Sequence, residues 1–223
     1  MAHPLLAAVE IETAANPGAT VIWLHGLGAD GHDFEPAVPA LVRPGGPALR
    51  FVFPHAPVRP VTINGGMSMR AWYDITGFDR QAAQDERGIR ASAAAIRTLI
   101  GRENERGIAT GRIVLAGFSQ GGALALFTGT RLQEKLAGII GLSCYMLLAD
   151  SFAAERTAPN QDTPLLLAHG AFDPVVSPEL GEQTRALLAA TGYAVEWHGY
   201  PMAHSVCMEE LAVVASFLQK VLL

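Results

Sequence analysis

The sequence is short of cysteine, of charge and of basic clusters, and each shortage excludes a class of function. Only two of the 223 residues are cysteine, Cys144 and Cys207, which do not make a disulfide framework in a chain this long and are expected to be buried thiols. Charged residues make up 17%, and the 16 basic residues are scattered among 21 acidic ones. A nucleic-acid-binding face requires clustered positive charge, so we expect no nucleic-acid partner.

Long hydrophobic runs are missing as well. The longest uncharged apolar stretch, residues 136–149, contains glycines and a serine and is too short to cross a bilayer. The first residues, MAHPLLAAVEIET, lack the basic and apolar regions of a signal peptide. We therefore expect no stable membrane insertion and a cytoplasmic location.

Hydrophobic residues nevertheless make up half of the chain, which suffices for a large core and, we expect, for one domain spanning residues 1–223. Short apolar runs predict an edge strand at residues 7–13 and further strands at residues 20–24, 49–53, 112–116, 138–142, 165–168 and 194–199. Helical periodicity predicts helices at residues 84–106, 120–129, 178–190 and 206–221, the last capped by Ser205. This alternation predicts an α/β fold, with a mostly parallel central sheet and helices on both faces.

The segment GFSQG at residues 117–121 matches the pattern G-x-S-x-G between a predicted strand and a predicted helix, which is the context of a nucleophile elbow. Small residues two positions before and after the serine allow a tight turn that exposes its hydroxyl at a helix N-terminus. Ser119 is therefore the candidate nucleophile, and the alternative is a glycine-rich packing turn. Ser143 makes only half of the match, because Tyr145 replaces the second glycine, and is expected to be structural.

A nucleophilic serine needs a base and a third group that orients the base, and in this architecture the chain order is serine, acid, histidine. His204 lies between the last predicted strand and the last helix, where an imidazole can reach the elbow; a solvated loop histidine is the alternative. Asp173 directly follows the strand at residues 165–168, with a turn or cap residue as the alternative. Asp150 lies farther from its strand, and Asp162 lies at the wrong end of one.

Acyl transfer also requires N–H groups that stabilise the negative oxygen of the tetrahedral intermediate. The elbow supplies the backbone N–H of Gln120, whose side chain is expected to matter less. The glycine-rich loop at residues 25–31 would supply the N–H of Leu27, unless it is a generic turn. Neither a phosphate loop nor a metal-ligand spacing is present, so we expect no metal and no other cofactor.

Four stretches, WLHGLGADGHDF, AGFSQGGALAL, HGAFDPVV and MAHSV, follow one another in this order. Together they resemble the phospholipase/carboxylesterase family of small α/β-hydrolases, which includes the acyl-protein thioesterases. The resemblance implies an α/β-hydrolase fold with no large lid domain, a triad of Ser119, Asp173 and His204, and Leu27 and Gln120 as oxyanion donors. It also implies carboxylic ester or thioester substrates and leans toward a homodimer.

The long irregular stretch at residues 54–80 is expected to be functional, because such loops are uncommon in compact domains. Residues 59–78 resemble the family's substrate-flanking loop, so Met67, Met69 and Trp72 are expected to line an acyl groove, with core packing as the alternative for Trp72.

Members of the family often carry an aromatic-Leu-Pro run after the equivalent of Cys144. Here the run is Tyr145-Met146-Leu147, so Met146 and Leu147 are expected to give the acyl pocket its own shape.

The expected activity is that of a serine hydrolase, a carboxylesterase that cleaves short- to medium-chain carboxylic esters, and thioesters as a second class, through an acyl-enzyme on Ser119. The expected partner is thus a small-molecule or lipid acyl ester. One alternative is a lysophospholipase or an acyl-protein thioesterase acting on long acyl chains. A more distant alternative is a non-catalytic binding module built on the same fold.

Overall fold

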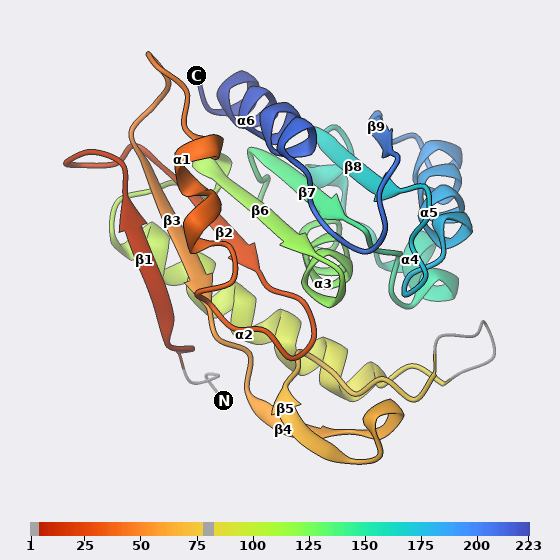
Figure 1. The fold of residues 1–223 in the computed structure, drawn as a ribbon. Coiled ribbons are helices and arrows are strands. Elements are labelled where there is room, and N and C mark those ends of the chain that lie inside the picture. The colour runs from red at the N-terminus through yellow and green to blue at the C-terminus, as the bar shows by residue number, and fades with distance from the viewer. Residues whose placement is uncertain (1–4, 78–82) are drawn as a thin grey trace.

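The computed structural model describes residues 5–77 and 83–223, and its centre is a mostly parallel β-sheet (Figure 1). Within these residues, seven strands pair in the order β1-β3-β2-β6-β7-β8-β9, and β1 alone is antiparallel to its neighbour. The strands of this sheet are β1 (Ala8–Glu12), β2 (Ala19–Leu24), β3 (Leu49–Pro54), β6 (Ile113–Phe118), β7 (Gly138–Leu142), β8 (Leu165–Gly170) and β9 (Val195–Tyr200). The predicted parallel sheet and its edge strand are thereby confirmed.

Helices cover both faces of the sheet. One buried cluster includes side chains of α1 (Val38–Leu41) and α6 (Met208–Leu222), which pack against each other. The other cluster includes side chains of α2 (Glu86–Glu105), α3 (Gln120–Gly129), α4 (Ala149–Glu155) and α5 (Pro178–Ala190). None of the described helices is both long enough and apolar enough to cross a membrane.

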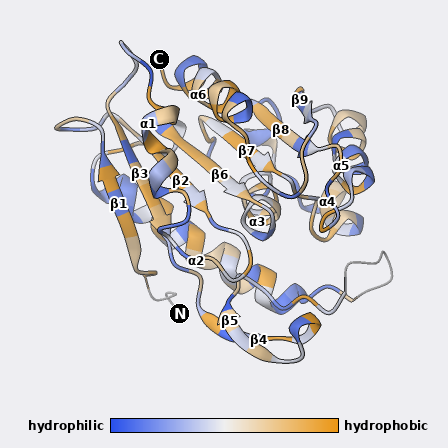
Figure 2. Cartoon of the chain, viewed as in Figure 1, coloured by the Kyte–Doolittle hydropathy of each residue, from blue (hydrophilic) through white to orange (hydrophobic). Residues whose placement is uncertain are grey.

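Burial on both faces explains the continuous apolar runs of the central strands. Every residue of β2 and of β8 is buried. The central strands β6 and β8 are largely hydrophobic in Figure 2, whereas the outer helices α5 and α6 alternate between polar and apolar residues. A parallel strand covered on both sides has no solvent-facing positions for polar side chains, so its sequence shows no alternation.

The strand order reverses between β2 and β6. From β2 the chain moves outward to β3, whereas β6, β7, β8 and β9 follow one another in the other direction. The loops after β2 and β6 therefore leave the carboxyl edge of the sheet next to each other. Open α/β sheets bind ligands at this kind of switch point.

The stretch at residues 54–80, expected to be irregular, contains a hairpin. In it, β4 (Val58–Val61) pairs antiparallel with β5 (Met67–Arg70). The turn contains Gly65 and Gly66 at φ of 67° and 79°, a region that favours glycine. The Asn-Gly-Gly sequence of this turn is the signal that predicts a hairpin. Residues 78–80 of the stretch lie outside the described residues.

The last helix begins later than predicted. It starts at Met208, with Cys207 at the N-cap position and no side-chain cap, so the prediction that Ser205 caps it is wrong. Cys207 is also partly exposed, whereas Cys144 is buried as expected.

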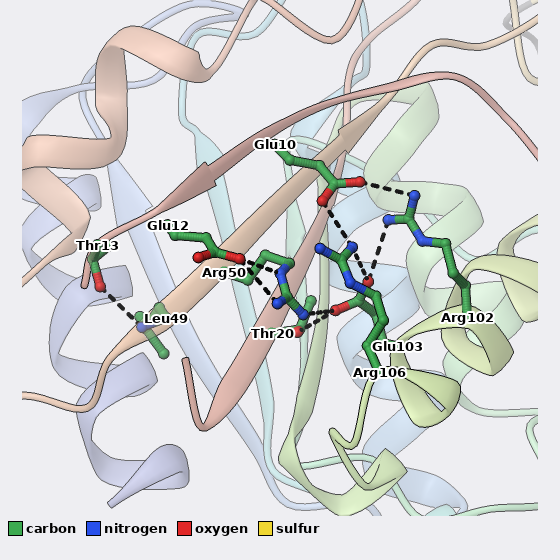
Figure 3. A network of polar contacts seen from close by, with 9 residues as sticks. All are labelled: Glu10, Glu12, Thr13, Thr20, Leu49, Arg50, Arg102, Glu103 and Arg106. Atoms are coloured by element: carbon green, nitrogen blue, oxygen red, sulfur yellow. Dashed lines mark hydrogen bonds and ion pairs between the residues drawn. The ribbon is translucent and has the colours of Figure 1, made fainter. Parts of the chain in front are cut away.

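A buried polar network joins the end of α2 to the amino-terminal ends of β2 and β3 (Figure 3). The carboxylate of Glu103, which is fully buried, accepts hydrogen bonds from Thr20 Oγ1 and Arg50 Nη1 at 2.8 Å each, and from Arg106 Nη1 at 3.0 Å. Burial alone would raise the pKa of Glu103, but the bonds from Arg50 and Thr20 bring it below its ordinary value. The network therefore holds an ion pair at the end of the sheet opposite to the switch point.

Candidate active site

Ser119 occupies the turn between β6 and α3 with an unusual backbone conformation. Its φ is 54° and its ψ is −122°, a combination that L-residues rarely adopt and that costs free energy. The Ser119 N–H donates to the carbonyl of Leu142 at 2.8 Å, and the Ser119 carbonyl accepts from the N–H of Ala123 at 2.9 Å. The strained turn is therefore held both to the sheet and to the helix.

The glycines around Ser119 are required by close backbone contacts. A Cβ on Gly117 would lie 2.4 Å from the carbonyl carbon of Gly121, and a Cβ on Gly121 would lie 2.2 Å from the carbonyl oxygen of Leu24. Side chains at these positions would overlap backbone that cannot move aside. This confirms the prediction that the turn needs small residues on both sides of the serine.

The structure brings Ser119, His204 and Asp173 into one line of hydrogen bonds. His204 Nε2 lies 2.9 Å from Ser119 Oγ, and His204 Nδ1 lies 2.7 Å from Asp173 Oδ2. Because an ionised carboxylate only accepts, Nδ1 carries the proton in this arrangement and Nε2 is free to accept one from the serine hydroxyl. The ring of Phe118 packs against the imidazole with a centroid distance of 4.7 Å. The geometry is that of a nucleophile, a base and an acid that orients the base.

Asp173 is almost fully buried and is held by its own loop. Its second carboxylate oxygen, Oδ1, accepts the N–H groups of Val175 at 2.8 Å and Val176 at 2.9 Å. The carbonyl of Val176 in turn accepts from Nε2 of the buried His169 at 2.9 Å. These bonds fix the carboxylate toward His204 and leave little freedom for rotation.

The loop after β2 lies against the nucleophile turn. A Cβ on Gly26 would be 3.6 Å from Ser119 Cβ, so the backbone at residues 26–28 passes beside the serine. Among the described residues, neither the N–H of Leu27 nor the N–H of Gln120 donates to a protein carbonyl or side chain. Two unpaired donors beside a partly exposed serine are the arrangement that an oxyanion requires.

His25 sets the direction of the Leu27 N–H. Its Nε2 accepts the N–H of Ala56 at 3.0 Å, so its Nδ1 carries the proton and donates to the carbonyl of Gly26 at 2.7 Å. Burial lowers the pKa of His25 to about 4, which keeps the ring neutral. In a trans peptide the C=O and the following N–H point in opposite directions, so holding the Gly26 carbonyl turns the Leu27 N–H away from the imidazole.

A cavity of about 710 Å³ borders the Asp173 loop. Its lining includes Val175 and Val176, whose N–H groups bind Asp173, together with Tyr73, Ile75 and Met146, although no triad residue itself lines it. This volume lies within the range of roughly 300–1,000 Å³ that ligand pockets occupy. Its position next to the acid of the triad makes it the candidate acyl cavity.

Known proteins are similar to this chain in sequence and in fold. A family model described as phospholipase/carboxylesterase matches residues 6–222. The chain belongs to the phospholipase/carboxylesterase family. It is therefore an α/β-hydrolase, as the resemblance predicted, and a serine hydrolase.

The relatives of this phospholipase/carboxylesterase chain include fungal and plant proteins. Acyl-protein thioesterase 1 of Neurospora crassa is 46% identical over 217 residues, which cover 93% of this chain and 89% of that protein. Acyl-protein thioesterase 1 of Gibberella zeae is 41% identical, with 99% and 97% covered. The crystal structure of Zea mays acyl-protein thioesterase 2 has a TM-score of 0.84 at 29% identity and covers 97% of this chain and 100% of its own. Arabidopsis thaliana SOBER1 has a TM-score of 0.85 at 28% identity, with 92% and 99% covered.

Four of the five residues expected to line the acyl groove do not line the cavity. Trp72 and Leu147 are fully buried in the core cluster on the α2 and α3 face. Met146 does line the cavity. Met67 lies 65% exposed on the β4–β5 hairpin, and the Met69 sulfur lies near Gly28 of the oxyanion loop, 3.8 Å from where a Cβ would be. The wall that Trp72 was expected to form is instead made by its neighbour Tyr73.

The structure gives the side chains of Gln120 and His25 partners that the sequence did not identify. The prediction that the Gln120 side chain matters little is wrong, because it is buried and makes two hydrogen bonds to the backbone at residues 72–73. The role of the His25 ring also depends on a long-range contact with Ala56. The signal in the sequence is position alone: Gln120 carries one of the two expected oxyanion donors, and His25 lies two residues before Leu27, which carries the other.

Proposed function

We propose that this protein hydrolyses short- to medium-chain carboxylic esters, and thioesters as a second class, through an acyl-enzyme on Ser119. The observation that carries the proposal is the line of hydrogen bonds from Ser119 through His204 to the buried Asp173, at 2.9 and 2.7 Å. A serine hydroxyl is a weak nucleophile at neutral pH, and this line supplies both the base and the group that orients it.

The proposed reaction has two halves. In the first, Ser119 Oγ attacks the acyl carbon while its proton moves to His204 Nε2, and the N–H groups of Leu27 and Gln120 stabilise the negative oxygen. The imidazolium, stabilised by Asp173, then gives the proton to the leaving alcohol or thiol. In the second half His204 accepts a proton from water as the water attacks the acyl-enzyme, and it then returns the proton to Ser119 Oγ as the acid is released.

A second candidate substrate is a long-chain acyl thioester. The cavity of about 710 Å³ supports it, since an acetyl group would leave most of this space unfilled. The names of the fungal and plant relatives also support it. Comparing p-nitrophenyl esters of two to sixteen carbons with matching thioesters would separate the candidates, because a steep optimum at the longest chains contradicts the short-ester proposal. A cytoplasmic location and a homodimer are further proposals, which fractionation and light scattering would test.

The decisive experiment is Ser119→Ala. We expect kcat/KM for p-nitrophenyl esters to fall at least about 10,000-fold, because loss of the nucleophile leaves only the oxyanion donors and binding. The melting temperature should stay close to that of the wild type. A fluorophosphonate probe should label the wild type and leave the variant unlabelled.

Ser143→Ala is the matched control. Ser143 also follows a strand at positive φ, 47°, but it is fully buried and its hydroxyl has no hydrogen-bond partner among the described residues. This variant should keep its labelling and its turnover. If Ser119→Ala turned over at the wild-type rate, or if only Ser143→Ala lost activity, the assignment of the nucleophile would be wrong.

A further inference from the structure

The chain at Trp72 and Tyr73 passes through the protein interior without belonging to a strand. Both residues are buried, so their backbone polar groups need partners inside the protein. The Gln120 side chain supplies two of them: its Oε1 accepts the N–H of Trp72 and its Nε2 donates to the carbonyl of Tyr73, both at 2.8 Å. The carbonyl of Trp72 accepts from Ser92 Oγ of α2. A backbone N–H can only donate and a carbonyl can only accept, so these contacts also assign the orientation of the Gln120 amide.

The same segment is tied to the other side of the candidate oxyanion hole. Trp72 Nε1 donates to the carbonyl of His25 at 2.9 Å, and the His25 ring holds the carbonyl of Gly26. Trp72 therefore contacts both loops that carry the oxyanion donors. It contacts the first loop at His25, which directly precedes the Gly26–Leu27 peptide, and the second through the Gln120 side chain.

The segment also continues into the candidate acyl cavity. Tyr73 and Ile75 line that cavity, and Met146 lies on its wall as well. Gln120 thus has its backbone N–H beside the serine hydroxyl and its side chain on the backbone that forms the cavity wall. Gln120 therefore connects the oxyanion hole, where the reacting carbonyl binds, to the wall of the candidate acyl cavity.

We propose that the Gln120 side chain is a positioning residue that holds the cavity wall at Tyr73 in register with the oxyanion hole and so sets the acyl-chain preference. This inference rests on the proposed acyl hydrolysis. A short acyl group reaches the serine without touching the wall, whereas a longer chain must bind along it while its carbonyl lies in the oxyanion hole. Loosening the wall therefore penalises long chains more than short ones.

The test is Gln120→Glu, which keeps the shape of the side chain. One oxygen of the introduced carboxyl can still accept from the Trp72 N–H, but the other faces the Tyr73 carbonyl and can donate to it only when protonated. Burial raises the pKa of such a carboxyl, so it will keep its proton at acidic and neutral pH and lose it under alkaline conditions. The measured quantity is kcat/KM for p-nitrophenyl octanoate divided by that for the acetate. This ratio cancels any pH effect that is common to both substrates, because both use the same catalytic groups.

At pH 9.5 we expect this ratio to fall about tenfold below the wild type, which is the effect of losing one buried hydrogen bond. At pH 5.5 it should return to within about threefold of the wild type, because the protonated carboxyl restores the bond. Gln161→Glu is the matched control: Gln161 Nε2 also donates to a backbone carbonyl, that of Thr191 at 3.0 Å, but away from the cavity. It should leave the ratio unchanged at both pH values.

An unchanged ratio in Gln120→Glu at pH 9.5, an equal loss for both esters, or a loss that does not depend on pH would each overturn the proposal. Amide hydrogen exchange gives a second measurement that needs no turnover. In Gln120→Ala the Trp72 N–H should exchange at least about tenfold faster than in the wild type. An unchanged rate would also overturn the proposal that the Gln120 side chain holds this segment. If no fluorophosphonate labelled the wild type, that result would instead count against the proposed function. The exchange measurement would still test the contact between Gln120 and Trp72, because it does not depend on catalysis.

Discussion

The carboxyl group of Glu210 should make this protein less stable as the pH rises. Glu210 lies at the third position of α6, where a glutamate can reach back to the N-cap and where the helix dipole favours a negative charge. It is nonetheless fully buried, and neither carboxylate oxygen has a hydrogen-bond partner among the described residues. Burial raises the pKa of Glu210 from 4.5 to about 8, and the nearby N–H of Cys207, which does not reach hydrogen-bonding geometry, opposes this only weakly.

The direction of the effect follows from proton binding. Between pH 4.5 and 8 the unfolded chain releases the Glu210 proton while the folded chain keeps it, so unfolding becomes more favourable as the pH increases. Each pKa unit corresponds to about 1.36 kcal/mol. The free energy of unfolding should therefore fall by about 3 kcal/mol between pH 4 and pH 7 through this one group. Above pH 8 the total decrease should level off at about 4–5 kcal/mol.

The variant Glu210→Gln isolates this contribution, because the amide has the shape of the protonated acid and cannot ionise. Urea unfolding at pH 4, 7 and 9 should show similar stabilities at pH 4 and a variant that is about 3 kcal/mol more stable at pH 7. Glu209→Gln removes the same charge from the same helical turn at an exposed position, and should differ from the wild type by about 0.5 kcal/mol or less throughout. A stability difference for Glu210→Gln that does not change with pH would refute the reasoning.

Two further changes test the buried network and the nucleophile turn. Glu103→Ala leaves the mostly buried Arg50 without its main partner. It should reduce the free energy of unfolding in urea by about 3–5 kcal/mol. A loss below about 1 kcal/mol would show that the network contributes little to stability. Gly121→Ala places a Cβ 2.2 Å from the Leu24 carbonyl and should cost about 3 kcal/mol and abolish fluorophosphonate labelling. By contrast, Gly101→Ala in α2 meets nothing within 4 Å and should stabilise the protein by about 0.5–1 kcal/mol; equal melting temperatures for the two variants would contradict the steric argument.

The sequence predicted the elements whose pattern is local. Strands buried on both faces appear as continuous apolar runs, and α3 and α5 begin and end where their periodicity and caps indicate. The nucleophile turn was also predictable, because a strained strand-to-helix turn needs glycine at Gly117 and Gly121 whatever surrounds it. The acid and the base followed from chain order and from the rule that sites lie at the carboxyl edge of a parallel sheet.

The sequence did not predict which side chains meet across long distances in the chain. The hydrogen bond between Gln120 and Trp72 joins residues 48 positions apart, and no local pattern distinguishes it from a solvated glutamine. The sequence is equally compatible with Trp72 in a groove and with Trp72 in the core. Only the packing of α2 and α3 places it in the core.

What the sequence determined by itself is therefore the fold class and the chemistry of the site, because periodicity and turn geometry are properties of neighbouring residues. What only the tertiary structure decided is burial: that Glu210 has no partner, that Glu103 has several, and that the Gln120 side chain holds the cavity wall. The cost of removing a polar group from water depends on every atom that surrounds it, and those atoms come from all parts of the chain.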